Sequence, residues 1–82
     1  MYFIYILSNK INSQLYKGVT KDLEKRLKEH NQGKHKYTSE FMPWEIVYYE
    51  EYESFSEARE RELYFKSGSG REFLKKILFN SI

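Results

Sequence analysis

Cysteine is absent from this 82-residue sequence, so neither a disulfide bond nor a thiolate metal site can form. This absence fits a reducing compartment, and we expect the protein to be cytoplasmic. A long apolar run is also lacking. The longest uncharged stretch, MYFIYILSN, is too short and too rich in tyrosine to span a membrane, and it has no basic leader or cleavage site. We therefore expect a soluble protein that has no membrane partner.

Proline and glycine are scarce, with one and four residues, while 40% of the residues are hydrophobic and 32% are charged. This composition is globular, and the length predicts one domain, residues 1–82. A domain of this size buries only about 60% of its unfolded surface, so the core must be modest. Eight tyrosines, six phenylalanines and one tryptophan supply large buried areas and leave phenols for the surface or for a site.

The net charge of +2 is too small to indicate a nucleic-acid partner by itself. The distribution of charge along the sequence is more informative. Residues 21–36 hold six Lys or Arg against three Asp or Glu, residues 45–62 hold two against seven, and residues 66–76 hold four against one. Two basic segments thus flank an acidic one. The pattern suits a phosphate track around a metal-attracting centre, and it equally suits charges spread over solvated faces.

Hydrophobic periodicity predicts the element order β-β-α-β-α-α. The predicted strands are residues 2–7, 15–20 and 44–53, and the predicted helices are residues 21–31, 54–66 and 71–79. The first strand lacks polar alternation, which is typical of a strand covered on both faces. Because a helix separates the second strand from the third, we expect a small mixed sheet with helices on its faces.

Residues at the predicted helix ends suggest caps. Thr20 is positioned to cap the first helix. For the second helix Ser56 is the more favoured cap, although Ser54 and Glu57 have capping-box spacing. The glycine-containing segment 67–70 is expected to end this helix.

Alternation along the third predicted strand assigns its side chains to two faces. Ile46, Tyr48 and Tyr52 are expected on one face, and Val47 and Tyr49 on the other.

Arg26 and His30 lie four residues apart on the first predicted helix, so they project from the same face. Arginine offers a planar fork that matches phosphate oxygens, and histidine titrates near neutral pH and can relay a proton. The pair is equally compatible with an ordinary solvated helix surface.

Glu62 stands out on the second predicted helix. At 100° per residue it lies close to Phe65 on the apolar stripe, whereas Glu60 lies at the back. A carboxylate that faces a packed interior must be paired or bound to a cation. It is either a rim glutamate paired with Arg59, Arg61 or Lys66, or a ligand for a hard cation such as magnesium.

Tyr5 and Tyr16 each lie in a predicted strand and can simply pack in the core. An antiparallel register that pairs residue 5 with residue 16, or with a position two away, would place both phenols on one face. The connection between the strands permits this register without enforcing it.

Two triplets give these residues a common context: FIY at residues 3–5 and YKG at residues 16–18. They are followed by VTKDLEKRLKEHNQGK at residues 19–34 and PWEIVYYEEYESFSEARERELYFKSG at residues 43–68. This ordered set resembles the GIY-YIG nuclease family, and in particular its short stand-alone members. The resemblance spans residues 2–79.

The resemblance implies an α+β fold, with a small three-stranded, mainly antiparallel sheet flanked by helices. It also implies a metal-dependent endonuclease that hydrolyses phosphodiester bonds in nucleic acid, with DNA as the expected substrate, in repair or recombination-type processing. The implied cofactor is one Mg²⁺ or Mn²⁺ ion. A protein partner or a dimer would supply target specificity. The competing hypothesis is a non-catalytic nucleic-acid-binding module on the same scaffold.

The resemblance also implies roles for the residues whose positions match the family motifs. The implied catalytic residues are Tyr5, Tyr16, Arg26, His30 and Glu62, with Glu62 as the metal ligand. The expected nucleic-acid-binding residues are Lys17, Gly18, Lys21, Lys34 and Lys36.

The sequence departs from the family pattern at a few positions. Phe3 replaces the first motif glycine, and Lys17 replaces the central isoleucine of the second motif. An asparagine that some members place after the metal-binding helix has only Asn80 as a counterpart here.

Overall fold

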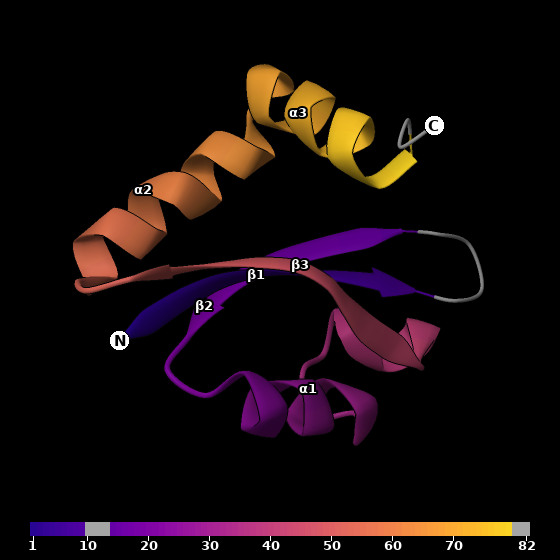
Figure 1. Cartoon of the computed structure of the whole chain (residues 1–82). Helices are drawn as coiled ribbons and strands as arrows, with labels where there is room; N and C mark the ends of the chain where they lie inside the picture. Colours follow the sequence, from indigo (N-terminus) through magenta and orange to yellow (C-terminus); the bar gives the residue numbers. More distant parts are fainter. Residues whose placement is uncertain (10–13, 80–82) are drawn as a thin grey trace.

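The computed structural model describes residues 1–9 and 14–79. Its three strands, β1 (Tyr2–Asn9), β2 (Leu15–Thr20) and β3 (Trp44–Tyr52), form one sheet in the order β2-β1-β3 (Figure 1). The element order is the predicted β-β-α-β-α-α. Asn80, the counterpart of the family asparagine, lies outside the described residues.

Both strand pairings in this sheet are antiparallel, so the expectation of a mixed sheet is wrong. The chain does cross over through a helix between β2 and β3. Because β1 lies between these two strands, they run in the same direction without pairing. The mainly antiparallel sheet implied by the family resemblance is the correct one.

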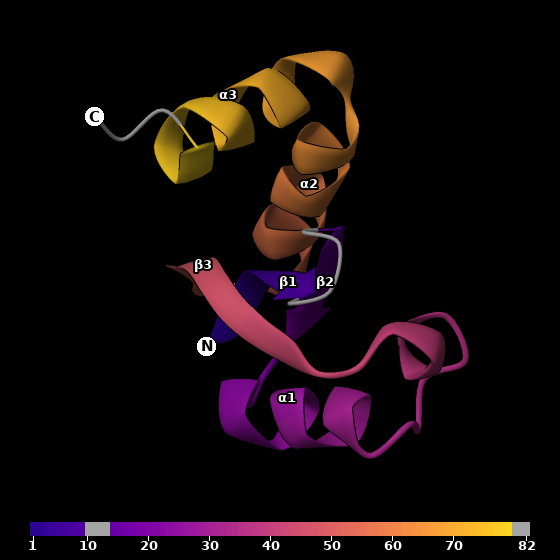
Figure 2. The same cartoon turned by 90° about the vertical axis from the view of Figure 1, so that its right-hand side faces the viewer.

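Helices cover both faces of the sheet. The helix α1 (Leu23–Asn31) lies on one side, and α2 (Phe55–Lys66) and α3 (Gly68–Phe79) lie on the other (Figures 1 and 2). A short 3-10 turn, η1 (Thr38–Phe41), connects α1 to β3. In the described part of the chain, none of the helices has the length and apolar character that crossing a membrane requires.

The core consists of two clusters separated by β1. Ile4 and Ile6 pack with residues of α2 and α3 on one side of the sheet. Tyr5 and Leu7 pack with Trp44 on the α1 side. All four β1 side chains are buried, as predicted for a strand covered on both faces.

A β-bulge changes which faces the β3 side chains use. Consecutive residues 6–7 of β1 pair with Tyr48 and Ile46, so Val47 is the extra residue. Ile46 therefore packs on the α1 side, whereas Val47 and Tyr48 pack on the α2 side. The predicted shared face of Tyr48 and Tyr52 is confirmed. The placement of Ile46 with them and of Val47 on the opposite face is wrong, because strict alternation cannot anticipate the inserted residue.

Two caps also differ from the prediction. Asp22, not Thr20, caps α1 by accepting a hydrogen bond from the backbone N–H of Lys25 at 3.1 Å. Ser54, not Ser56, caps α2, since its hydroxyl accepts from the backbone N–H of Glu57 at 3.2 Å. In each case the carboxylate or hydroxyl that lies three residues before its N–H partner has the reach a cap requires. The predicted Ser54–Glu57 pair is in contact, but the Glu57 carboxylate meets the Ser54 hydroxyl, which donates to Oε1 at 3.0 Å, and not the backbone N–H that a full capping box uses.

The segment 67–70 is a tight junction between two helices. Ser67 ends α2, and α3 begins at Gly68, three residues earlier than predicted. A Cβ atom at Gly70 would lie 1.9 Å from the carbonyl oxygen of Tyr64, whereas one at Gly68 would meet nothing within 4 Å. Gly70 therefore permits the close approach of the two helices.

Replacing Gly70 with alanine should lower the free energy of unfolding by roughly 1–3 kcal/mol, because backbone must move to accept the new methyl group. For a domain of this size that corresponds to a fall in Tm of several degrees, measurable by thermal denaturation followed by circular dichroism. Gly68→Ala is the matched control and should leave Tm unchanged or slightly raised. Equal Tm values for the two variants would contradict this account of the junction.

Candidate active site

The site begins where Tyr5 of β1 crosses Gly18 of β2. The two residues are directly paired, and a Cβ atom at Gly18 would lie 2.5 Å from Tyr5 Oη and 2.7 Å from its Cζ. Only glycine leaves room for the phenol to reach across β2, which is an edge strand. Tyr16 lies on the same face, with its ring centroid 6.4 Å from that of Tyr5. The hypothesis that both phenols share one face is confirmed.

Helix α1 adds His30 to this face. Leu23, Leu27 and His30 follow the spacing i, i+4, i+7, which turns the histidine toward the sheet. His30 is completely buried, so the solvated-surface alternative is wrong for this residue. The spacing was visible in the sequence and could have placed His30 inside.

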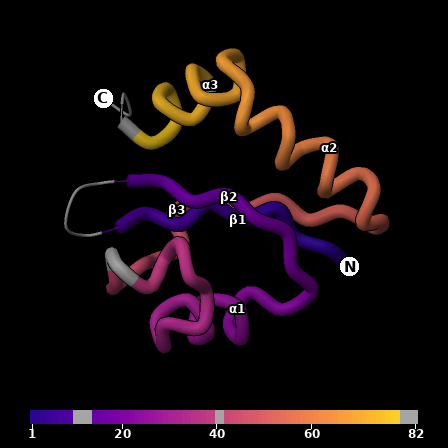
Figure 3. Tube along the Cα trace, turned by 180° about the vertical axis from the view of Figure 1, so that it is seen from behind, coloured from indigo at the N-terminus to yellow at the C-terminus, as the bar shows by residue number. Residues whose placement is uncertain are grey.

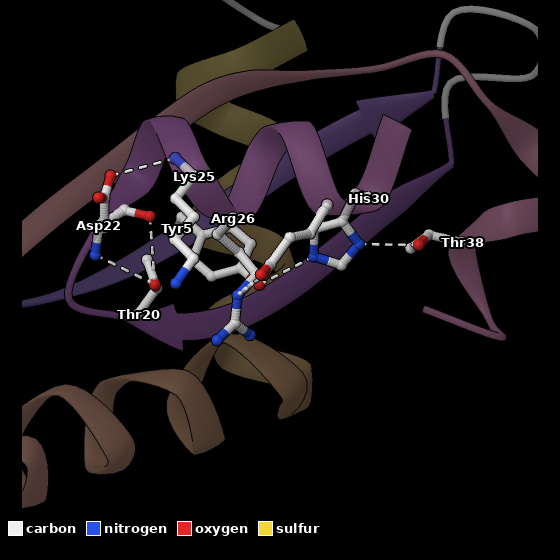
Figure 4. A network of polar contacts seen from close by, with 8 residues as sticks. Tyr5, Thr20, Asp22, Lys25, Arg26, His30 and Thr38 are labelled. Carbon is white, nitrogen blue, oxygen red and sulfur yellow. Dashed lines mark hydrogen bonds and ion pairs between the residues drawn. The ribbon is translucent and has the colours of Figure 1, made fainter. Parts of the chain in front are cut away.

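A buried chain of hydrogen bonds runs through His30 (Figure 4). Tyr5 Oη lies 3.0 Å from Nε2, and Thr38 Oγ1 lies 2.7 Å from Nδ1. The Thr38 hydroxyl proton is directed to the carbonyl of His35 at 3.4 Å. The Thr38 oxygen is then the acceptor for an Nδ1–H, so Nε2 carries the lone pair that accepts the proton of Tyr5.

Burial sets the protonation states of this pair. Burial, together with the charges of His35 and Arg26, lowers the pKa of His30 to about 4, so the imidazole is neutral near pH 7. Burial and the neighbouring Tyr16 raise the pKa of Tyr5, which the Arg26 guanidinium partly opposes through its charge and a hydrogen bond. The pair is therefore a neutral phenol that donates to a neutral imidazole.

Arg26 borders the same cluster, one turn before His30. Its Nε lies 3.2 Å from Oε1 of Glu29, and its side chain is about one-third exposed. Arg26 and Glu29 line a hollow of about 290 Å³ together with Lys21 and Lys25. Lys21 in turn lies with its Nζ 5.0 Å from the ring centre of Tyr2. Arg26 is thus placed between solvent and the Tyr5 phenol.

Glu62 approaches from the opposite face of the sheet, on α2. It is 8% exposed, as the helical wheel predicted, and Glu60 is exposed. Arg59 Nη1 donates to its Oε1 at 2.7 Å, and Lys66 Nζ donates to its Oε2 at 2.8 Å. Burial by itself would raise the pKa of Glu62, but the hydrogen bonds from Lys66 and Arg59 hold it below its ordinary value.

The residues that the family resemblance assigns to the site lie on two sides of the sheet. Tyr5, Tyr16, Arg26 and His30 come together on the α1 face, and Glu62 lies beyond β2 on the α2 face. The negative charge of Glu62 nevertheless contributes to the raised pKa of Tyr5. The sheet separates them: Figure 3 shows β2, the edge strand, and β1 passing between α1 and α2.

Glu62 has the chemistry of a ligand for a hard cation. In the described residues, no three His, Cys, Asp or Glu side chains cluster to hold a metal ion, so an ion at Glu62 would have at most two such ligands. Magnesium usually keeps several waters and binds one or two carboxylates plus substrate phosphate, which this arrangement suits. An ion would have to replace Arg59 or Lys66, and both of these side chains are about half exposed and able to move.

A second ion pair keeps α2 in place. Glu50 of β3 accepts from Arg61 Nε at 2.8 Å and from Arg61 Nη2 at 3.2 Å. Such forked pairs are geometrically specific. Arg61 is thereby engaged with Glu50 rather than with Glu62, which leaves Arg59 and Lys66 as the Glu62 partners.

The predicted nucleic-acid-binding lysines are spread over several positions. Lys17 follows Tyr16 on β2, so its side chain lies on the other face of the sheet. Burial, and then the charges of the nearby Arg71 and Lys66, lower the pKa of Lys17. Lys34 and Lys36 are exposed in the segment between α1 and η1.

Sequence reasoning missed the contribution of the segment after α1. The His35 ring stacks on the His30 ring with centroids 4.2 Å apart, and Thr38 forms a hydrogen bond with Nδ1 of His30. Trp44 Nε1 donates to the Thr38 carbonyl at 2.8 Å and holds the turn against the core. No spacing rule covers this irregular segment, so no sequence signal was available.

A family model described as the GIY-YIG catalytic domain matches residues 1–76. The chain belongs to the GIY-YIG family.

Relatives within this family are also small proteins. The chain is 43% identical to UPF0213 protein CPE1444 of Clostridium perfringens, over 100% of this chain and 88% of that protein. It is 44% identical to UPF0213 protein YazA of Bacillus subtilis, over 79% of this chain and 66% of that protein. The solution NMR structure of the UPF0213 protein BH0048 from Bacillus halodurans superposes with a TM-score of 0.57 at 32% identity, covering 99% of this chain and 89% of that one.

The buried neutral state of His30 predicts a specific pH dependence of folding. The unfolded chain takes up a proton on His30 below about pH 6.5, whereas the folded protein does so only near pH 4. The free energy of unfolding should therefore fall by on the order of 3 kcal/mol as the pH is lowered through this window. Urea denaturation at several pH values measures it.

His30→Gln is the control, because glutamine forms hydrogen bonds but does not titrate. The free energy of unfolding of this variant should change much less between pH 6.5 and pH 4.5. A parent and variant with the same pH slope would rule out His30 as the responsible group.

Proposed function

We propose that the protein is a metal-dependent endonuclease that hydrolyses phosphodiester bonds in nucleic acid. DNA is the expected substrate, in repair or recombination-type processing. Membership of the GIY-YIG family supports a nuclease in general. The single observation that carries the proposal is the buried Tyr5–His30 pair, flanked by the Arg26 guanidinium at the edge of the sheet.

In this mechanism Tyr5 and His30 act as a proton relay. With a raised pKa the phenol is not ionised at neutral pH and cannot act as a base by itself. As the attacking water loses a proton to Tyr5 Oη, the Tyr5 hydroxyl proton passes to the lone pair of His30 Nε2. The imidazolium so formed keeps its Nδ1–H on Thr38, which holds the ring in place. Tyr16, whose ring lies 4.9 Å from His30, closes this pocket.

In this mechanism, residues on both sides of β2 stabilise the negative charge of the reacting phosphate. Arg26 exchanges Glu29 for a non-bridging phosphate oxygen, where negative charge grows in the transition state. Glu62 is the residue that would hold one Mg²⁺ or Mn²⁺ ion, which supplies Lewis-acid stabilisation of the leaving oxygen when bound.

A non-catalytic nucleic-acid-binding module remains the second candidate function. The observation that favours it is the ion-pair cluster on α2, where both carboxylate oxygens of Glu62 already have cationic partners. In that case Glu62 has a structural role, and the lysines alone contact phosphates.

Glu62→Gln and Arg26→Ala should each lower the rate of cleavage by at least ~100-fold, the scale expected for loss of a main electrostatic stabiliser. Nicking of plasmid and branched DNA with Mg²⁺, Mn²⁺ or EDTA measures this rate. Glu60→Gln, an exposed carboxylate on the same helix, is the matched control and should cut like the parent. Cleavage by Glu62→Gln at the parent rate would exclude the metal-ligand role.

Thr38→Val should lower the rate of cleavage by roughly 100-fold, because the Nδ1–H loses its acceptor and the other tautomer blocks proton transfer from Tyr5. Thr38→Ser retains the hydroxyl and should restore most of the activity. An unchanged Tm of Thr38→Val, together with rescue by Thr38→Ser, separates this effect from a packing defect. An unchanged rate in Thr38→Val would exclude the relay.

A further inference from the structure

A second feature lies along the outer edge of β2, next to the residues already described. We name it the Tyr37 hollow; it measures about 250 Å³ and is lined by Leu15, Tyr16, Lys17, Tyr37 and Lys66. Tyr16 and Lys17 are consecutive on β2, so their side chains lie on opposite faces of the sheet. The hollow therefore extends around the strand edge, from the α1 side to the C-terminal end of α2.

One wall of the hollow is aromatic. The Tyr37 ring is 54% exposed, and its centroid lies 5.9 Å from that of Tyr16. The Gln14 side chain donates a hydrogen bond to the Tyr37 hydroxyl, which anchors the outer end of the ring. Tyr37 thus presents an exposed aromatic surface that a hydrogen bond and the neighbouring Tyr16 ring support, which suits a stacking platform.

The opposite wall is cationic. Lys17 and Lys66 line the hollow, and the charge of Arg71 acts on Lys17 together with that of Lys66. Partial burial, and then the charges of Arg71 and Lys66, lower the pKa of Lys17. Glu62 offsets part of this charge through its ion pair with Lys66, but Lys17, Lys66 and Arg71 outnumber it, and a local excess of positive charge favours an anion.

The aromatic platform and the cations together match a nucleotide, with the base on Tyr37 and the phosphate at Lys17 and Lys66. Inside a duplex each base has both faces covered by its neighbours, so away from the ends only an unpaired, unstacked base can place a face on an aromatic side chain. Tyr16 belongs both to the hollow and to the cluster around His30, which puts this nucleotide next to the reacting phosphate.

We infer that the Tyr37 hollow binds an unpaired nucleotide of the substrate, so that the protein prefers single-stranded or frayed nucleic acid over intact duplex. The inference rests on the proposed function only in calling the bound nucleic acid a substrate for cleavage. Binding of the unpaired nucleotide can be measured without cleavage.

Binding should be measured by fluorescence anisotropy in EDTA, where a metal-dependent nuclease cannot cut. The probes are a labelled DNA single strand of about 12 nucleotides and the blunt duplex made from it. Parent protein should bind the single strand more tightly than the duplex. Tyr37→Ala should weaken binding of the single strand by roughly tenfold, the effect expected for loss of one stacked base, and change duplex binding little.

Three further variants separate stacking from other effects. Tyr37→Phe keeps the ring and should retain most of the affinity for the single strand. Tyr49→Ala removes a tyrosine of nearly equal exposure, 53%, from β3 and should bind like the parent. Lys17→Gln should reduce the slope of log affinity against log salt by about 0.7, the value for one phosphate contact on a single strand. The Tm of each variant confirms that the fold is intact.

The outcomes distinguish this inference from the proposed function. If parent protein cuts DNA and Tyr37→Ala binds the single strand normally, the hollow is not a nucleotide site and the nuclease stands. If Tyr37→Ala has a lower affinity for the single strand but the parent cuts no DNA, the hollow is a nucleotide site and the protein is a binding module. Equal losses for single strand and duplex, or no DNA binding by the parent, overturn the inference.

Discussion

The close crossing of Tyr5 over Gly18 is the constraint on which the site depends. The phenol occupies the space that any side chain at position 18 would need, 2.5 Å from the position of a Cβ atom. This crossing brings the hydroxyl of a central-strand residue to the outer edge of the sheet, where α1 adds Arg26 and His30. A larger residue at position 18 would displace the phenol and separate it from the imidazole.

The buried histidine imposes the second constraint, because each ring nitrogen needs a partner when water is excluded. Tyr5 and Thr38 meet this need from different parts of the chain. Thr38 is itself held by Trp44, whose backbone N–H donates to the Asn31 side chain at 2.7 Å. The irregular segment between α1 and β3 is therefore part of the support of the site, and its polar contacts fix the tautomer of His30.

The groups on the two faces of the sheet have neighbours in common around β2. Glu62 is paired with two cations on its own helix, and one of them, Lys66, also lines the Tyr37 hollow. The carboxylate, the hollow and the Tyr5–His30 pair thus share neighbours around one edge strand. An edge strand suits this arrangement, because it is the only part of a three-stranded sheet that side chains can approach from both faces and from the side.

Local patterns in the sequence determined the element order and the inward orientation of Glu62. Both follow from a period of 3.6 or 2, which backbone geometry imposes on any chain. The shared face of Tyr5 and Tyr16 was only permitted by the sequence, since it depends on the register between β1 and β2. The same periodicity would have placed His30 inside, had the stripe from Leu23 been extended by one turn. Helix caps and the bulge at Val47 escaped prediction, because both depend on a shift of one or two residues that periodicity does not resolve.

Only the tertiary structure decided which groups meet. The contact of Thr38 with His30, the stacking of His35 and the hydrogen bond from Gln14 to Tyr37 join a residue that precedes β2, a helix and an irregular segment. The position of such a segment depends on long-range packing against Trp44 and the sheet, and on the requirement that buried polar atoms find partners. These are properties of the folded chain as a whole, and no stretch of the sequence contains them by itself.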